Sequence, residues 1–278
     1  RQRNLRVIKN SRNMGCAYSR NLIISNAKGE FIAFFDDDDF SRADRIKLQY
    51  AKLVSYERIN STNLVACFAS GEKKYENGYT KHFHSVGIYG NPPVGKQMAN
   101  YLLFFERLSG VFYGAGVPTC ALFARKSVFE NIGGFDTKMR RQEDVDFGIR
   151  LALEGGHFIG IPEPVLTQYA TNTGDKSHLI EFESSLLLIN KHFEYLCSKG
   201  LYHYMRMWIE LRYKHFNSDG LGSIYTLIKI FLKYPFRTTK HFLYSASNRF
   251  LHEQLIYSDP RSLNYRLKCV KFLKKLLR

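Results

Sequence analysis

The chain has 278 residues and a formal net charge of +16, with 41 Lys and Arg against 25 Asp and Glu. Its apolar fraction of 45% is enough to bury a core, which excludes a largely disordered protein, and no apolar run approaches the roughly 18 residues that span a bilayer. The five cysteines are scattered without a C-x-x-C pair, which argues against a disulfide framework and a zinc site.

Strand and helix signals alternate over the first two thirds of the chain, which predicts an α/β layered domain. The strand at residues 31–35 is almost wholly apolar, as in parallel sheets that are covered on both faces. Ser41 and Asp44 form a capping-box pattern, which predicts that a helix begins there. The predicted strands are residues 5–8, 31–35, 63–70, 117–124 and 157–161, and the predicted helices are residues 17–27, 41–56, 126–131 and 142–154.

The last third of the chain is helical and basic. From residue 185 to the end there are 17 Lys and Arg against five Asp and Glu, so most of the positive surplus lies here. We place a boundary between residues 1–176, the α/β domain, and residues 177–278, a basic helical region. Helices are predicted at residues 186–196, 202–216, 224–234 and 263–277.

Four consecutive carboxylates, Asp36 to Asp39, directly follow the strand at 31–35. The N-terminus of a following helix favours one or two nearby acids, but it does not account for four that repel one another. In open α/β sheets, ligands bind outside the carboxyl ends of the strands. Carboxylates spaced D-x-D at that edge suit a hard cation, Mg²⁺ or Mn²⁺, that also contacts a substrate diphosphate.

Two blocks of sequence resemble family 2 glycosyltransferases, which have the GT-A fold. The first block is NMGCAYSRN followed by KGEFIAFFDDDD, and the second is RKSVFENIGGFD followed by QEDVDFGIRL. The resemblance implies a GT-A-like (Rossmann-like), mostly parallel sheet with helices on both faces. It also implies transfer of a sugar from a nucleotide-diphosphate donor to a hydroxyl group, with inversion at the anomeric carbon.

The second block carries the residues that match the catalytic positions of the family. Asp144 matches the base that takes the acceptor's proton, and Glu143 is expected to orient the acceptor or a neighbouring backbone group. Because Asp144 lies near the start of a predicted helix, we expect the helix dipole to favour its ionised form at a solvent-facing sheet edge.

The first block carries the residues that match the donor and metal positions. Asp38 and Asp36 match the D-x-D, and Asp38 is the first choice for direct contact with a divalent cation, Mg²⁺ or Mn²⁺. Asp39 is expected to be only a charge beside the following helix. The expected donor-binding residues are Asp37, Asn13 and Arg20.

The resemblance covers about residues 5–171 and begins in the middle of the family's domain. The strand-helix-strand unit with which family members open, and which holds the nucleotide base, has no counterpart here. We therefore expect the sequence to be a fragment of a longer gene product, and we expect the 278-residue chain alone to lack transferase activity.

The segment 263–277 has the pattern of a basic amphipathic helix, and residues 224–237 mix apolar and basic residues in the same way. Such helices suit an anionic membrane surface. A helical cap on the first domain or an oligomer contact is the alternative explanation. The membrane interpretation predicts a cytoplasmic protein, peripheral at the inner face of the plasma membrane. Its acceptor would be a saccharide or lipid-linked, as in the assembly of cell-surface polysaccharide or glycolipid.

Three other functions are compatible with parts of the sequence. A non-catalytic sugar-nucleotide-binding fragment would show the same motifs. Basic helices with interleaved Tyr and Phe can bind nucleic acid, but no recognised motif supports this and it leaves the acids unexplained, so no nucleic-acid partner is expected. A metal-dependent phosphotransferase or hydrolase would need a nucleophile beside a base, and the sequence shows none.

Overall fold

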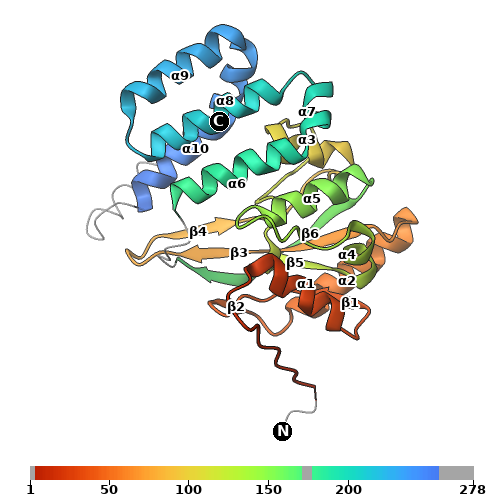
Figure 1. Ribbon diagram of the computed structural model, residues 1–278. Coiled ribbons are helices and arrows are strands. Elements are labelled where there is room, and N and C mark those ends of the chain that lie inside the picture. The colour runs from red at the N-terminus through yellow and green to blue at the C-terminus, as the bar shows by residue number, and fades with distance from the viewer. Residues whose placement is uncertain (1–3, 171–176, 257–278) are drawn as a thin grey trace.

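A mixed β-sheet forms the middle of the protein in the computed structural model, which describes residues 4–170 and 177–256. The strands are ordered β1-β5-β3-β6-β2 (Figure 1). The remaining strand, β4, pairs with the C-terminal half of β3, whereas β5 pairs with its N-terminal half. The strands are β1 (Phe31–Ala33), β2 (Asp39–Ser41), β3 (Val65–Lys74), β4 (Thr80–Phe83), β5 (Leu122–Arg125) and β6 (His157–Tyr169).

The prediction of a mostly parallel sheet is wrong for the described residues. Only β3 and β6 run parallel, whereas the pairs β1–β5, β3–β5, β3–β4 and β2–β6 are antiparallel. The apolar run at 31–35 is buried only in part: Ile32 and Phe34 enter the core, whereas Phe35 is 55% exposed. Burial on both faces, however, is equally compatible with a mixed sheet covered by helices, so it carries no information about strand direction.

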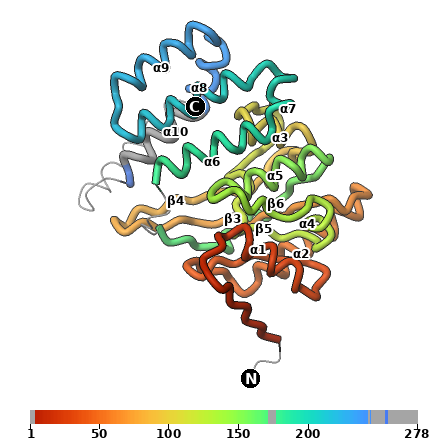
Figure 2. Tube along the Cα trace, viewed as in Figure 1, coloured from red at the N-terminus to blue at the C-terminus, as the bar shows by residue number. Residues whose placement is uncertain are grey.

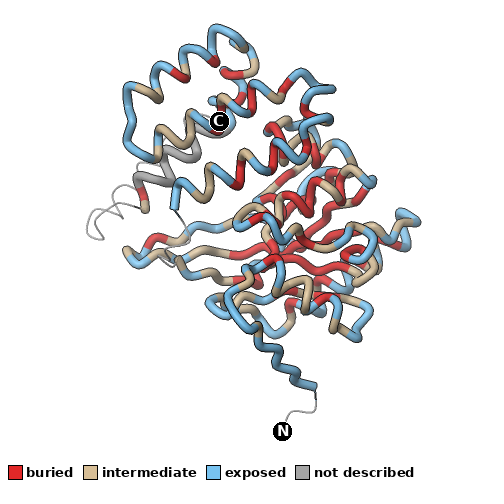
Figure 3. The backbone as a smooth tube through the Cα atoms, in the orientation of Figure 1, coloured by how far each residue is buried: buried red, intermediate tan, exposed pale blue. Residues whose placement is uncertain are grey.

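Helices cover this sheet, as its burial pattern requires. The first seven residues of β3 are all buried, which is the pattern of a strand with protein on both faces (Figure 3). On the sheet, α2 contributes the fully buried Leu53, and α3 and α5 contribute Met98, Phe147 and Leu151 to the same core. The helices of this part are α1 (Cys16–Asn26), α2 (Arg45–Asn60), α3 (Lys96–Phe104), α4 (Lys126–Ile132) and α5 (Glu143–Leu153), with a 3₁₀ turn, η1 (Thr119–Ala121).

The remaining described helices gather on one side of the sheet, with α9 at the outer edge (Figure 1). They share a second apolar cluster with α3 and α5, in which Leu103 and Ile149 pack with Leu188, Tyr204 and Ile230. The predicted helix 202–216 is confirmed, and the predicted helix 263–277 lies outside the described residues. These helices are α6 (His178–Lys191), α7 (Phe193–Ser198), α8 (Tyr202–Phe216), α9 (Gly220–Lys233) and α10 (Pro235–Ile256).

Two local predictions near the N-terminus are wrong. Residues 4–15 form no strand, and they extend away from the body of the protein with Leu5 and Val7 exposed (Figure 2). The apolar alternation there has no neighbouring strand to pair with, so propensity alone does not produce one. The capping box also fails: Ser41 ends β2, α2 begins at Arg45, and Asp44 makes no side-chain cap.

Candidate active site

The four acids occupy the connection between β1 and β2. Asp37 and Asp38 form an exposed turn, while the half-buried Asp36 and Asp39 lie on either side of it. Ligand atoms of Asp36, Asp39 and Cys120 all lie within 4.8 Å of one another. Asp39 is the first residue of β2, and its carboxylate lies near that of Asp36. This corrects the expectation that Asp39 lies beside the following helix. The proposed metal contact of Asp38 stays a prediction.

Pairing between β2 and β6 holds Asp39 in this position. Asp39 lies opposite Gln168 in the ladder, and the Gln168 side-chain amide donates to Asp39 Oδ2 at 3.3 Å. The same amide lies 3.3 Å from Cys120 Sγ. Burial raises the pKa of the Cys120 thiol to about 12, and the charges of Asp36, Asp39 and Asp144 add to the effect. The thiol is therefore protonated. Because the charge of Asp144 also raises the pKa of Cys120, Asp144 lies near the same thiol as Asp36 and Asp39.

A buried arginine lies behind the acids. The Arg45 side chain, on the first residue of α2, is fully buried and donates to Phe34 O at 3.1 Å, Ser41 Oγ at 2.9 Å and Gln49 Oε1 at 3.0 Å. Burial lowers the pKa of Arg45, and the charges of Asp39 and Asp36 oppose that effect. Sequence reasoning missed this residue. One signal could have indicated it: Arg45 lies at the start of a helix, where the helix dipole disfavours positive charge, so its position there needs another explanation.

Arg20 connects the acidic cluster to the second sequence block. Its guanidinium, on α1, donates to Glu143 Oε1 at 2.5 Å and lies 4.0 Å from Asp36 Oδ1. The Cys16 thiol also donates to Glu143 Oε1, at 3.2 Å. Burial raises the pKa of Asp36. The charge of Arg20 opposes that effect, and the charges of Asp38, Asp37 and Glu143 add to it. Three residues predicted from separate motifs are thus adjacent.

Asp144 is the second residue of α5, directly after Glu143. Its Oδ1 accepts a hydrogen bond from the Val145 N–H at 2.8 Å. Burial and the charge of Glu143 raise the pKa of Asp144 to about 6, despite that hydrogen bond and the charge of Arg20. Asp144 is half-buried, and its surroundings and the neighbouring like charge oppose the effect expected of the helix dipole, so its pKa is raised rather than lowered.

The residue before α5 adopts a left-handed conformation that α6 stabilises. Gln142 has φ of 64°, which is uncommon for a residue with a side chain. Its amide donates to Glu181 Oε1 at 2.9 Å and to Ser185 Oγ at 2.6 Å. The start of the helix that carries Glu143 and Asp144 is thus held by the helical region that follows residue 177.

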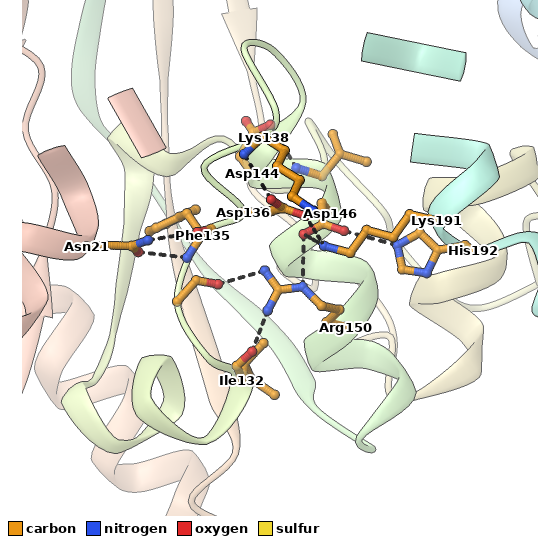
Figure 4. A network of polar contacts seen from close by, with 12 residues as sticks. Asn21, Ile132, Phe135, Asp136, Lys138, Asp144, Asp146, Arg150, Lys191 and His192 are labelled. Carbon is orange, nitrogen blue, oxygen red and sulfur yellow. Dashed lines mark hydrogen bonds and ion pairs between the residues drawn. The ribbon is translucent and has the colours of Figure 1, made fainter. Parts of the chain in front are cut away.

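Asn21 links the two sequence blocks through the backbone. Its side-chain amide donates to Phe135 O at 2.7 Å, and its Oδ1 accepts from Phe135 N–H at 2.8 Å (Figure 4). Gly134 approaches so closely that an added Cβ would lie 2.5 Å from Asn21 Oδ1. The glycine pair before Phe135 thus allows α1 to approach the segment that leads into α5.

A second polar cluster lies on the other side of α5 (Figure 4). Asp146 is fully buried and accepts from Arg150 Nε at 2.9 Å and Lys191 Nζ at 3.0 Å, with His192 Nε2 at 3.2 Å. Arg150 also donates to the carbonyls of Ile132 and Gly134. This cluster joins α5 to α6 and to the loop that contains Gly134, so it fixes α5 on both sides.

Asn13 is the predicted site residue that the structure places apart from this group. It lies in the exposed turn before α1, where its Oδ1 accepts a hydrogen bond from Gly15 N–H at 3.0 Å. Asp37 is exposed in the turn between the other acids. Their donor contacts stay predictions.

Residues 1–133 match the model of Glycosyl transferase family 2. This part of the chain belongs to that family. The match includes Arg20 and the four acids, and it ends at the Gly-Gly pair before Phe135, so Glu143 and Asp144 lie outside it.

Curated relatives agree with this assignment. The chain is 30% identical over 166 residues to an uncharacterized glycosyltransferase of Haemophilus influenzae, a match that covers 60% of this chain and 47% of the relative. It is 28% identical over 189 residues to an uncharacterized glycosyltransferase of Rickettsia felis, covering 64% of this chain and 30% of the relative. The chain therefore spans about half or less of the length of these relatives.

Among solved structures, the UDP complex of S. aureus TarS residues 1–349 matches with a TM-score of 0.45 and 14% identity, covering 75% of this chain and 54% of that one. A TM-score below 0.5 does not establish a common fold. Within the described residues, no helix is long and apolar enough to cross a membrane.

Proposed function

We propose that this chain carries the metal, donor and catalytic residues of an inverting glycosyltransferase. The enzyme moves a sugar, of the hexosyl type, from a nucleotide-diphosphate donor to a hydroxyl group, on a GT-A-like scaffold. One observation carries the proposal: Arg20 contacts both Asp36 of the acidic cluster and Glu143 of the second block. Residues inside the family match and residues outside it thereby form one site.

The acidic cluster suits a hard divalent cation. Carboxylates supply the oxygen ligands that Mg²⁺ and Mn²⁺ prefer, whereas a protonated thiol such as Cys120 is a poor ligand for them. We propose Asp36 as one ligand, with Asp38 or Asp39 as the second. When bound, the cation supplies positive charge for the leaving diphosphate. Asp37 and Asn13 are proposed to contact the donor from the exposed side.

Asp144 suits the role of general base. Its pKa of about 6 lies close to neutral pH, where a base is both ionised and able to accept a proton. Glu143 is held by Arg20, so we assign it the task of positioning rather than proton transfer. Arg20 contacts both Glu143 and Asp36, and we propose that its charge also attracts the diphosphate of the donor.

The acceptor is proposed to be a saccharide or a lipid-linked saccharide, in the assembly of cell-surface polysaccharide or glycolipid. The basic C-terminal helices support a peripheral location at the cytoplasmic face of the plasma membrane, where such acceptors are found. Nothing about the site favours a nucleic-acid ligand, because acids rather than cations dominate it.

The cation site can be tested by Mn²⁺ titration of the purified chain, followed by electron paramagnetic resonance. We expect Asp36→Asn to weaken Mn²⁺ binding by about tenfold or more. Asp38→Asn and Asp39→Asn then show which acid is the second ligand. Asp44→Asn, an exposed acid paired with Arg42, is the matched control. Equal Mn²⁺ affinity in all these variants and the wild type would remove the cation from the proposal.

Catalysis is tested separately, by release of nucleoside diphosphate from sugar donors in the full-length gene product. Asp144→Asn is expected to reduce the rate by about 10²–10⁴-fold. In the wild type, log(kcat/KM) should rise with pH up to about 6 and then level off, because the ionised form is the base. Donor binding without any transfer would support a non-catalytic sugar-nucleotide-binding protein instead.

A further inference from the structure

Helix α9 exposes an unbroken apolar stripe to solvent. The stripe consists of side chains spaced at i, i+3, i+4, i+7, i+10 and i+11, which places them on one face of a helix. Leu221 is 85% exposed and Leu232 is 77% exposed, and Phe236 at the start of α10 is 92% exposed. The members on α9 are Leu221, Ile224, Tyr225, Ile228, Phe231 and Leu232.

The opposite face of α9 already packs against the protein. Thr226 and Ile230 are buried, and Ile230 belongs to the apolar cluster of the helical region. Helix α9 is thus apolar on its inner face and along its outer stripe, and its lysines lie on one flank between them. A wide apolar surface of this kind is ordinarily covered by protein or lipid. Figure 3 shows the outer side of α9 as exposed, at the edge of the protein farthest from the sheet.

Positive charge borders the stripe. Two acids lie near it: Asp219 caps the start of α9, and Glu210 of α8, which is paired with Lys214, lines a cavity with Tyr225 and Lys229. Lys229 and Lys233 lie on one flank of the stripe, and Lys240 follows in α10. Arg237 is not part of this border, because its guanidinium lies over the buried rings of Phe104 and Tyr204. Lys229 Nζ lies 4.9 Å from the centre of the Tyr225 ring. The sequence has no Asp or Glu between Asp219 and Glu253. A second copy of this chain would bring the same cations together across the contact, which disfavours self-association through this face.

We propose that the outer face of α9, with Phe236, docks on an anionic lipid membrane. Apolar side chains enter the boundary between headgroups and acyl chains, and the bordering cations contact anionic headgroups, as in other interfacial helices. Helix α9 has 14 residues, fewer than the roughly 20 that span a bilayer, so the proposed arrangement places it in the plane of the membrane surface. This inference rests on the proposed function only in its purpose, which is to bring the site to a lipid-linked acceptor.

Flotation with lipid vesicles tests the docking face directly. The probes are vesicles of phosphatidylglycerol and phosphatidylcholine and vesicles of phosphatidylcholine alone, without donor or acceptor. We expect the wild-type chain to bind the anionic vesicles at least about tenfold more tightly. The triple variant Leu221→Gln, Ile228→Gln and Leu232→Gln should lose about tenfold or more of that affinity, although it keeps every cation.

The matched control is Ile59→Gln, which removes a 73% exposed side chain on α2 and should bind vesicles like the wild type. A second measurement uses Phe236→Trp, whose added fluorescence should shift to shorter wavelength with anionic vesicles. Trp208, the single tryptophan, is buried and gives a constant background. Circular dichroism melting confirms that the triple variant is folded.

Vesicle binding by the triple variant equal to that of the wild type would overturn the proposal, because cations elsewhere would then suffice. So would a wild-type dimer in sedimentation velocity without lipid that the triple variant lacks, since the face would then bind a second copy. The assay involves no sugar transfer. Failure of docking and failure of the proposed transferase activity are therefore distinguishable.

Discussion

The guanidinium of Arg20 donates to Glu143 Oε1 at 2.5 Å across 123 residues of sequence. Both side chains are largely buried, with 15% and 10% of their surface exposed. Removing one partner of such a pair leaves a buried charge without compensation, which is strongly destabilising. The contact is therefore both a structural tie between α1 and α5 and the link between the two halves of the candidate site.

We predict that Arg20→Gln lowers the free energy of unfolding by about 3 kcal/mol at pH 7, measured by urea denaturation. Arg42→Gln is the control, because the Arg42–Asp44 pair has the same 2.5 Å distance but is exposed. Exposed pairs contribute about 1 kcal/mol or less, so the control should change little. Equal losses in the two variants would show that Glu143 does not depend on Arg20.

Asn21→Ala should destabilise the protein by about 2–3 kcal/mol, because it removes a donor and an acceptor from the Phe135 backbone at once. Asn21→Asp keeps the acceptor for Phe135 N–H and should lose less. Asn26→Ala on the same helix removes only local bonds, from the Asn26 amide to Leu22 O and to the exposed Ser25 Oγ, and should cost about 1 kcal/mol. Thermal and urea unfolding of the three variants test this order, and a cost for Asn26→Ala as large as for Asn21→Ala would contradict it.

The Asp146 cluster predicts a loss of stability in acid. Burial alone would raise the pKa of Asp146, but the hydrogen bond with His192 and the charges of Arg150 and Lys191 lower it to about 2. A carboxyl group whose pKa is lower in the folded state stabilises the protein above its unfolded pKa, near 4, and loses that contribution as pH falls through about 2. The shift corresponds to about 2 kcal/mol.

Asp146→Asn should therefore lower the free energy of unfolding by about 3 kcal/mol at pH 7, and the difference from wild type should narrow as pH falls from 4 to 2. Urea denaturation at pH 7, 4 and 3 measures this. Glu210→Gln is the control, because its i,i+4 pair with Lys214 is exposed and similar in spacing. A difference that stays constant with pH would show that ionisation of Asp146 is not the cause.

Asp144 predicts the opposite dependence on pH. Its pKa is raised to about 6 in the folded protein, so the folded state holds a proton that the unfolded state releases near pH 4. Stability therefore falls as pH rises from about 4 to 6 and stays lower above that. Asp144→Asn removes this cost and should raise the free energy of unfolding by about 2 kcal/mol at pH 8, with little change at pH 4.

The control for Asp144 is Glu76→Gln, which alters an exposed acid in the turn between β3 and β4 and should have no effect at either pH. Urea denaturation at pH 4 and 8 gives both values. A variant more stable than wild type and also inactive would show a catalytic group kept at a cost in stability. Destabilisation by Asp144→Asn at pH 8 would mean that the carboxylate is not strained.

Local signals in the sequence predicted most elements of the fold. Apolar periodicity and glycine stops placed the helices at 17–27, 126–131, 142–154 and 202–216 within a residue or two of α1, α4, α5 and α8. They also placed the acids just after a strand that contributes Ile32 to the core. These features depend on the residues within a few turns of one another, so the sequence alone determines them.

Long-range contacts decided the rest. The antiparallel directions of β1, β2 and β5 depend on partner strands far along the chain. An apolar run predicts a buried strand but not whether its neighbour is parallel or antiparallel. That Asp39 lies close to Asp36 and Cys120 depends on pairing with β6, and the raised pKa of Asp144 depends on its surroundings in the folded protein, which no local pattern reveals. The sequence determined which polar and charged residues are available to the candidate site. Only packing between distant elements decided which of them meet, because burial, charge pairing and strand register are properties of the folded neighbourhood rather than of the chain.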